Sequence, residues 1–147
     1  MHELAFSKPT MTFIVGGPGV GKTTLVDSLF PKLKNSLVIR QDNISGPFLM
    51  TPDKSSGVFN VNWYKLGGAR HPINGGHYRD NIGIQVYRSM LELATDNLAF
   101  GLNPFVEGNY LSSIKCKYFQ EIVDPFLQEH LADKSISYKT KIILCYA

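Results

Sequence analysis

The sequence lacks the features that would assign its 147 residues to a specialised class. Its two cysteines, Cys116 and Cys145, have no metal-ligand spacing, and Cys145 lies in an apolar run, where a buried small hydrophobe is a better interpretation than a disulfide partner. No apolar stretch reaches the ~18 residues that a membrane span needs. The chain does not begin with a basic segment followed by a long apolar one, so we expect no secretory signal and predict a cytoplasmic location.

The chain also has little excess of either charge sign. The formal net charge of +3 is too small to indicate a nucleic-acid partner by itself, since a phosphate-binding enzyme would also be slightly basic. Neither an Asn-Lys-x-Asp guanine motif nor an Asp-x-x-Gly after the third predicted strand is found, which disfavours a GTPase. The length disfavours a helicase or motor and is typical of one domain with a substantial core.

One stretch carries a specific chemical signal. The residues from Gly16 to Thr24 fit the phosphate-binding pattern G-x-x-x-x-G-K-[ST], in which glycines let backbone N–H groups point at phosphate oxygens. Lys22 is predicted to act in catalysis by bringing its charge to the β- and γ-phosphates of ATP, and the Thr23 hydroxyl to ligate Mg²⁺. The predicted nucleotide-binding residues are Gly17, Pro18, Gly19, Val20, Gly21, Lys22, Thr23 and Thr24.

The residues around this loop have the order that the motif requires. Met11 to Val15 is a short apolar run that predicts a buried strand, and Lys22 to Phe30 predicts a helix that Pro31 ends. This strand–loop–helix order disfavours the alternative of a glycine-rich turn that binds nothing.

Further strands and helices alternate along the chain. Strands are predicted at Ser36–Arg40, Pro104–Glu107 and Lys141–Tyr146, the last being an apolar run of the kind buried in a parallel sheet. The periodicity predicts one helix over Arg79–Phe100, which Gly101 ends.

A second helix is predicted to begin at Ser112 or Ser113. Within it Phe119, Ile122 and Val123 should share one face, and the Asp124-Pro125 pair should restart the helix as a cap and a first-turn proline.

This alternation predicts an α/β fold of the three-layer P-loop NTPase type, with a mostly parallel sheet. We expect a single domain with its core in residues 10–42 and 79–147. Residues 43–78 are interpreted as a substrate-side insertion with a short helix or two. Because ligands bind at the carboxyl ends of parallel strands, the loop, Asp42 and Glu107 should meet on one edge.

Two carboxylates and an arginine are candidates for the chemistry on that edge. Asp42 follows the second predicted strand and Glu107 ends the third; either could accept a hydroxyl proton, or hold Mg²⁺ directly or through water. The alternatives are that Asp42 caps a helix beginning at Asn43 and that Glu107 is a solvated turn residue. Arg79, like Arg70, could contact the substrate.

With these residues in place, the chain resembles the P-loop kinases related to zeta toxins and polynucleotide kinases, a group with an AAA-type ATP-binding kinase domain. The similarity lies in the loop with its Pro18, in the strand from Leu37 to Asp42, and in the stretch from Asn103 to Asn109. It covers most of the chain except residues 43–78. The resemblance implies that Asp42 is the general base and that Glu107 contacts the substrate.

The resemblance also implies parts that this sequence does not contain. In such kinases a lid with catalytic arginines follows the fourth strand, and a fifth strand leads to residues that contact adenine. The sequence stops at Ala147, on what looks like the fourth strand, so we expect the lid and the last strand to be absent.

The sequence therefore predicts a kinase that transfers the γ-phosphate of ATP to a hydroxyl of a small molecule, a sugar nucleotide or a nucleic-acid end. Nucleic acid is possible only as a substrate, and no membrane partner is expected. The alternative is a nucleotide-binding regulatory module or a kinase fragment, without phosphotransfer. Because no fifth strand would cover the final strand, we also expect self-association through that sheet edge.

Overall fold

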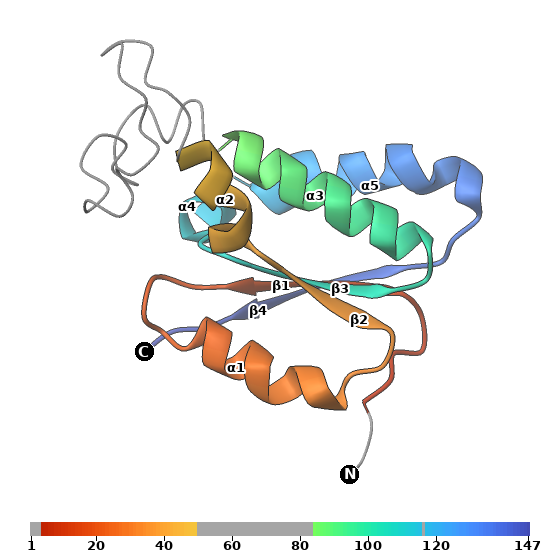
Figure 1. Cartoon of the computed structure of the whole chain (residues 1–147). Coiled ribbons are helices and arrows are strands. Elements are labelled where there is room, and N and C mark those ends of the chain that lie inside the picture. The colour runs from red at the N-terminus through yellow and green to blue at the C-terminus, as the bar shows by residue number, and fades with distance from the viewer. Residues whose placement is uncertain (1–3, 50–83, 116) are drawn as a thin grey trace.

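The computed structural model describes residues 4–49, 84–115 and 117–147. In these ranges four strands form one parallel sheet in the order β2-β3-β1-β4. The strands are β1 (Thr10–Val15), β2 (Ser36–Arg40), β3 (Asn103–Gly108) and β4 (Lys139–Leu144). The predicted α/β fold, with a parallel sheet between layers of helices, is confirmed (Figure 1).

Helices cover both faces of this sheet (Figure 1). The helix α1 (Lys22–Leu29) lies on one face, while α2 (Gln41–Leu49), α3 (Ile84–Ala99), α4 (Leu111–Lys115) and α5 (Asp124–Leu131) lie on the other. The chain passes from β1 to β2 through α1 and returns to β3 through α3 on the opposite face. Crossovers between parallel strands are right-handed. Because the chain moves across the sheet in one direction from β1 to β2 and in the other from β2 to β3, the two connecting helices lie on opposite faces.

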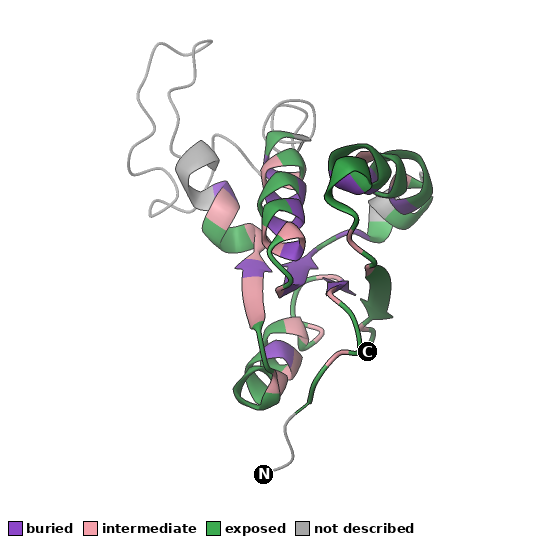
Figure 2. Cartoon of the chain, turned by 90° about the vertical axis from the view of Figure 1, so that its right-hand side faces the viewer, coloured by how far each residue is buried: buried purple, intermediate pink, exposed green. Residues whose placement is uncertain are grey.

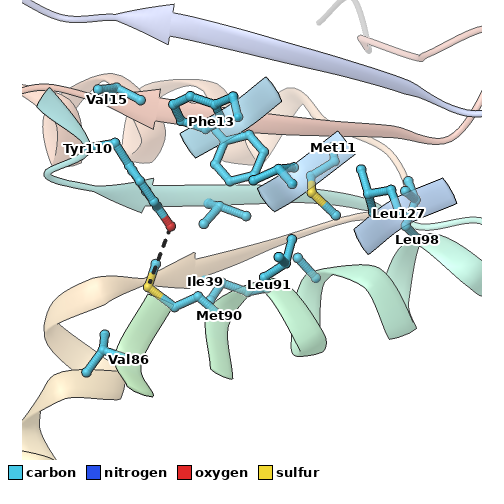
Figure 3. Close-up of a cluster of buried hydrophobic side chains, with 14 of the residues drawn as sticks. Met11, Phe13, Val15, Ile39, Val86, Met90, Leu91, Leu98, Tyr110 and Leu127 are labelled. Carbon is cyan, nitrogen blue, oxygen red and sulfur yellow. Dashed lines mark hydrogen bonds between the residues drawn. The ribbon is translucent and has the colours of Figure 1, made fainter. Parts of the chain in front are cut away.

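The larger core lies between the sheet and the helices α3 and α5 (Figure 3). Met11, Phe13 and Val15 alternate along β1 and reach this side, where Met90 of α3 and Leu127 of α5 meet them. The helical periodicity predicted for α3 is confirmed, because Val86, Met90, Leu91, Ala94 and Leu98 are all buried. Gly101, at φ +83°, ends the turn after α3 as predicted, and its N–H donates to the Leu98 carbonyl at 3.0 Å.

A smaller core lies under α1, on the other face of the sheet. Its buried members are Ile14 of β1, Phe105 of β3 and Val26 of α1. Successive strand residues point to opposite faces, so the neighbours of Ile14 in β1 belong to the larger core and Ile14 itself to the smaller one. This alternation decides which polar side chains at the strand ends face α1.

The position of β4 corrects the prediction of a buried final strand. The strand pairs with β1 over six residue pairs, from Thr10 with Lys139 to Val15 with Leu144. All six of its residues are nevertheless exposed, and Ile143 keeps 37% of its surface (Figure 2). Among the described residues β4 is the last strand of the sheet, and its apolar side chains remain in solvent. The predicted self-association through this edge stays a prediction.

The helical segment near residue 120 also differs from its predicted pattern. Residues Phe119–Val123 form a π-helical turn that runs directly into α5, so Asp124 and Pro125 continue a helix and do not restart one. A π-helical turn holds more residues than an α-helical turn, so it rotates the side chains away from the 3.6-residue pattern. Phe119 and Val123 are buried as predicted, whereas Ile122 is 51% exposed.

Helix α2 begins immediately after β2. Gln41 and Asp42 form its first turn, so Asp42 does not cap a helix beginning at Asn43. The predicted substrate contacts Arg70 and Arg79 and most of the interpreted insertion lie outside the described residues. Within the described ranges, no helix is both long and apolar enough to cross a membrane.

Buried tyrosines predict a loss of stability at alkaline pH. Burial raises the pKa of Tyr110 well above its usual range and raises the pKa of Tyr118 to about 12, with the nearby phenols as secondary causes. In the unfolded chain tyrosine side chains ionise at about pH 10. Both phenols therefore stabilise the folded state below that pH, and this contribution is lost as the pH rises toward their pKa values in the folded protein. Urea unfolding between about pH 8 and about pH 12 should show the decline. Tyr118→Phe should make it shallower, and Tyr146→Phe, at an exposed side chain, should not.

Candidate functional site

The loop between β1 and α1 turns through two glycines in the left-handed region. Gly19 has φ +73° and Gly21 has φ +94°, a conformation in which a side chain would be strained. Gly21 is the N-terminal cap of α1, and its carbonyl accepts the first helical hydrogen bond, from the Leu25 N–H at 2.9 Å. The helix therefore begins directly at the loop and directs its positive end toward it.

A third glycine allows close packing of the loop against the chain after β4. A β-carbon on Gly16 would lie 2.7 Å from the carbonyl oxygen of Cys145 and 2.8 Å from a methyl carbon of Val20. The Cys145 N–H also donates to the Val15 carbonyl at 2.7 Å, which holds this segment beside the loop. The base of the loop is thus packed between the chain after β4 and the side chain of Val20.

The ammonium group of Lys22 lies at the base of the loop. Its Nζ donates to the carbonyl oxygens of Gly16 at 2.8 Å and Gly17 at 2.7 Å. Gly19, Gly21, Lys22, Thr23 and Thr24 line an open concavity of about 220 Å³. The loop therefore places a cation and a helix N-terminus at one concave surface, which suits an anion.

The Thr23 hydroxyl contacts Glu107, which lies 84 residues further along the chain. It donates to Glu107 Oε1 at 2.5 Å. Glu107 is 7% exposed because β3 lies between β2 and β1 in the sheet. It is therefore a buried carboxylate beside the loop and not the solvated turn residue that the sequence left open.

Arg40 is the counter-ion of Glu107. Its Nε lies 3.1 Å from Glu107 Oε2, and both atoms are buried without a hydrogen-bond partner, so the contact is an ion pair that lacks hydrogen-bond alignment. Another nitrogen of the same guanidinium donates to Asp27 of α1. The hydrogen bond with Asp27, and then the charges of Asp27 and Glu107, outweigh desolvation and raise the pKa of Arg40.

Strand alternation explains why these side chains meet. Arg40 is paired with Glu107 in the sheet register, and both follow by two residues a neighbour in the smaller core, Val38 and Phe105. Both therefore face α1. Thr23 and Asp27 are four residues apart on α1, which places them on one side of the helix.

The remaining predicted site residues are less closely connected. Asp42 lies in the first turn of α2 with an exposed side chain, and no hydrogen bond or ion pair of its carboxylate is found within the described part of the chain. Its role as a base stays a prediction, as does the contact of Glu107 with a substrate. Arg79 lies outside the described residues.

The residues at the loop fit a magnesium ion bound together with phosphates. A hydroxyl whose hydrogen is donated to Glu107 keeps its oxygen lone pairs, and oxygen is the ligand that Mg²⁺ prefers. No group of three or more His, Cys, Asp or Glu residues that could hold a metal occurs in the described ranges, and Mg²⁺ at phosphates typically uses only one or two protein ligands.

No protein-family model matches the chain, and no curated protein matches it. Among solved structures, two of the Pnkp1/Rnl/Hen1 complex, one described as an RNA repair complex, are similar over 95% of this chain. Their identities are 13% and 17%, with TM-scores of 0.48 and 0.42. A structure of the PezAT chromosomal toxin–antitoxin system of Streptococcus pneumoniae is similar over 97% of this chain, with 16% identity and a TM-score of 0.48.

The chain spans 36%, 34% and 48% of the length of these three structures, respectively. Similarity at this level of identity and TM-score says nothing of substrate or activity.

Arg40 is the site residue that sequence reasoning missed. The strand pattern predicts Arg40 only as the last residue of a strand, and the predicted substrate contacts are Arg70 and Arg79. Two signals were present: Arg40 comes two residues before Asp42, and it ends a strand on the edge where ligands bind. Its pairing with Glu107 depends on the strand order, which the sequence does not state.

The close approach at Gly16 predicts a difference between two neighbouring glycines. Gly16→Ala should lower the free energy of unfolding by about 1–3 kcal/mol, because the added methyl group meets a backbone carbonyl that cannot move freely. Gly17→Ala is the matched control, since the nearest atom to its β-carbon would be a Leu111 methyl carbon at 3.8 Å. Equal urea-unfolding midpoints for the two variants would contradict this packing.

The position of Lys22 predicts that nucleotide binding depends on its charge. Charge-assisted contacts with phosphate are worth roughly 1.5–3 kcal/mol, so Lys22→Ala should weaken ATP·Mg²⁺ binding by about tenfold to a hundredfold. Calorimetric titration of the folded variants measures this loss. Lys32→Ala, at an exposed lysine after α1, should bind as the wild type does. Equal affinities of the wild type and Lys22→Ala would exclude the predicted role.

Proposed function

We propose that this chain binds ATP with Mg²⁺ at the Gly16–Thr24 loop and transfers the γ-phosphate to a substrate hydroxyl. The acceptor would be a small molecule, a sugar nucleotide or a nucleic-acid end. The observation that carries the proposal is the arrangement of Lys22 and Thr23. An ammonium group at the base of a glycine loop and a hydroxyl paired with a buried carboxylate lie at one helix N-terminus.

Each of these groups has a distinct task toward ATP. Loop N–H groups and the N-terminal end of α1 bind the phosphate oxygens, and Lys22 exchanges its bonds to loop carbonyls for the β- and γ-phosphates. Thr23 offers its hydroxyl oxygen to Mg²⁺, with Glu107 accepting the hydroxyl hydrogen. When bound, Mg²⁺ neutralises charge on the β- and γ-phosphates.

Asp42 is the proposed general base for the acceptor. In the transfer, the bond from the γ-phosphorus to the bridging oxygen breaks and ADP leaves with that electron pair. The acceptor oxygen forms the new bond to phosphorus, and its proton passes to the Asp42 carboxylate. The exposure of Asp42 at the start of α2 leaves it open to an incoming hydroxyl group.

Asp42→Asn separates the kinase from the alternative of a regulatory module or inactive fragment. A base touches the acceptor and not ATP, so the variant should keep the wild-type affinity for ATP·Mg²⁺. Its turnover should fall by roughly 10²–10⁴, the usual share of general acid–base catalysis. The assay follows ADP release with a panel of hydroxyl acceptors, and Asp133→Asn is the control at an exposed carboxylate.

Two results of this experiment would change the assignment. Wild-type turnover in Asp42→Asn would move the base to another residue. ATP binding without phosphate transfer to any acceptor would favour the regulatory module, because the loop would then bind nucleotide without using it.

A further inference from the structure

The guanidinium of Arg40 connects helix α1, which begins at the loop, with strand β3, which carries Glu107. Arg40 ends β2 and is paired in register with Glu107 of β3. One of its nitrogens lies 3.1 Å from Glu107 Oε2, and another donates to Asp27 of α1. Glu107 in turn accepts the Thr23 hydroxyl hydrogen with its other oxygen, Oε1. A closed set of contacts therefore runs from α1 through Arg40 and Glu107 back to α1.

From these contacts we infer that Arg40 is a positioning residue for Glu107 and the Thr23 hydroxyl, the proposed ligand of magnesium. It holds the Glu107 carboxylate so that Oε1 accepts the Thr23 hydroxyl hydrogen, which leaves the hydroxyl lone pairs to the cation. The inference rests on the proposed function, because it concerns how the same site holds ATP with Mg²⁺.

The division of the two Glu107 oxygens is the physical basis of this inference. An unpaired carboxylate that is 7% exposed would compete for the cation itself, or would turn toward any other donor. With Oε2 held by Arg40, only Oε1 faces Thr23. Residues that orient a metal ligand in this way typically change metal affinity by 10–100-fold when they are replaced.

The planar shape of arginine is needed for this task. Asp27 and Glu107 lie on different elements, and one guanidinium reaches both with separate nitrogens. A lysine would keep the positive charge but would present a single nitrogen. Arg40→Lys should therefore fold and show an intermediate loss, which gives a second variant in case Arg40→Met fails to fold.

The test measures ATP affinity by calorimetry on the full chain, once with Mg²⁺ and once with EDTA. The readout is the ratio of the two dissociation constants, the gain from magnesium. Arg40→Met should lower this gain by about tenfold while its affinity in EDTA stays near that of the wild type. A merely structural ion pair would lower the melting temperature and leave the gain unchanged.

Arg88→Met is the matched control. Arg88 also pairs with a glutamate, Glu92, at 3.0 Å, but both lie on α3 with 76% and 50% of their side chains exposed. This variant makes the same chemical change outside the site, so its magnesium gain should equal that of the wild type.

The outcomes separate this inference from the proposed function. A wild-type gain that persists in full in Arg40→Met overturns the inference and leaves the proposed function standing. If Arg40→Met does not fold, a full wild-type gain in Arg40→Lys overturns it in the same way. A wild type without magnesium-dependent ATP binding overturns the proposed function, and with it the inference.

Discussion

A carboxylate buried at the end of a central strand must be paired, and this requirement holds the start of α1 to the sheet. Glu107 is removed from water by its place in β3, and an isolated buried charge would cost several kcal/mol. Thr23 and Arg40 supply the compensating contacts. This one pairing orients the Thr23 hydroxyl and connects both α1 and the end of β2 to β3.

Close backbone packing restrains the same region without charge. The absence of a β-carbon at Gly16 lets the chain after β4 approach the loop, and its absence at Gly108 lets Gln41 and Tyr110 pack against the end of β3. A β-carbon on Gly108 would lie 2.8 Å from the ring of Tyr110 and 2.9 Å from Gln41 Oε1, which accepts the Asn109 N–H at 2.7 Å. The segment after β4 is therefore held beside the loop, and the segment after β3 is held against the start of α2.

Local patterns could be predicted where one physical rule dominates. The glycine loop, β2 and the buried face of α3 follow from motif spacing and periodicity, and the structure agrees with them. Periodicity failed at Ile122 because a π-helical turn changes the number of residues per turn. It failed for β4 because an apolar run indicates a strand without indicating whether that strand is central or at the edge of a sheet.

The sequence by itself determined the motif of the loop, since the glycines, the lysine and the hydroxyl follow one another at the set spacing of the phosphate-binding pattern. It also determined that Asp42 comes after the second strand and that Glu107 lies at the end of the third. Only the tertiary structure decided that Glu107 meets Thr23 and that Arg40 belongs to the site. The physical reason is that these contacts depend on strand order and register, which set α1 against residues 84 positions away. Such long-range pairings leave no local pattern in the chain, whereas a motif of neighbouring residues such as Gly16 to Thr24 does.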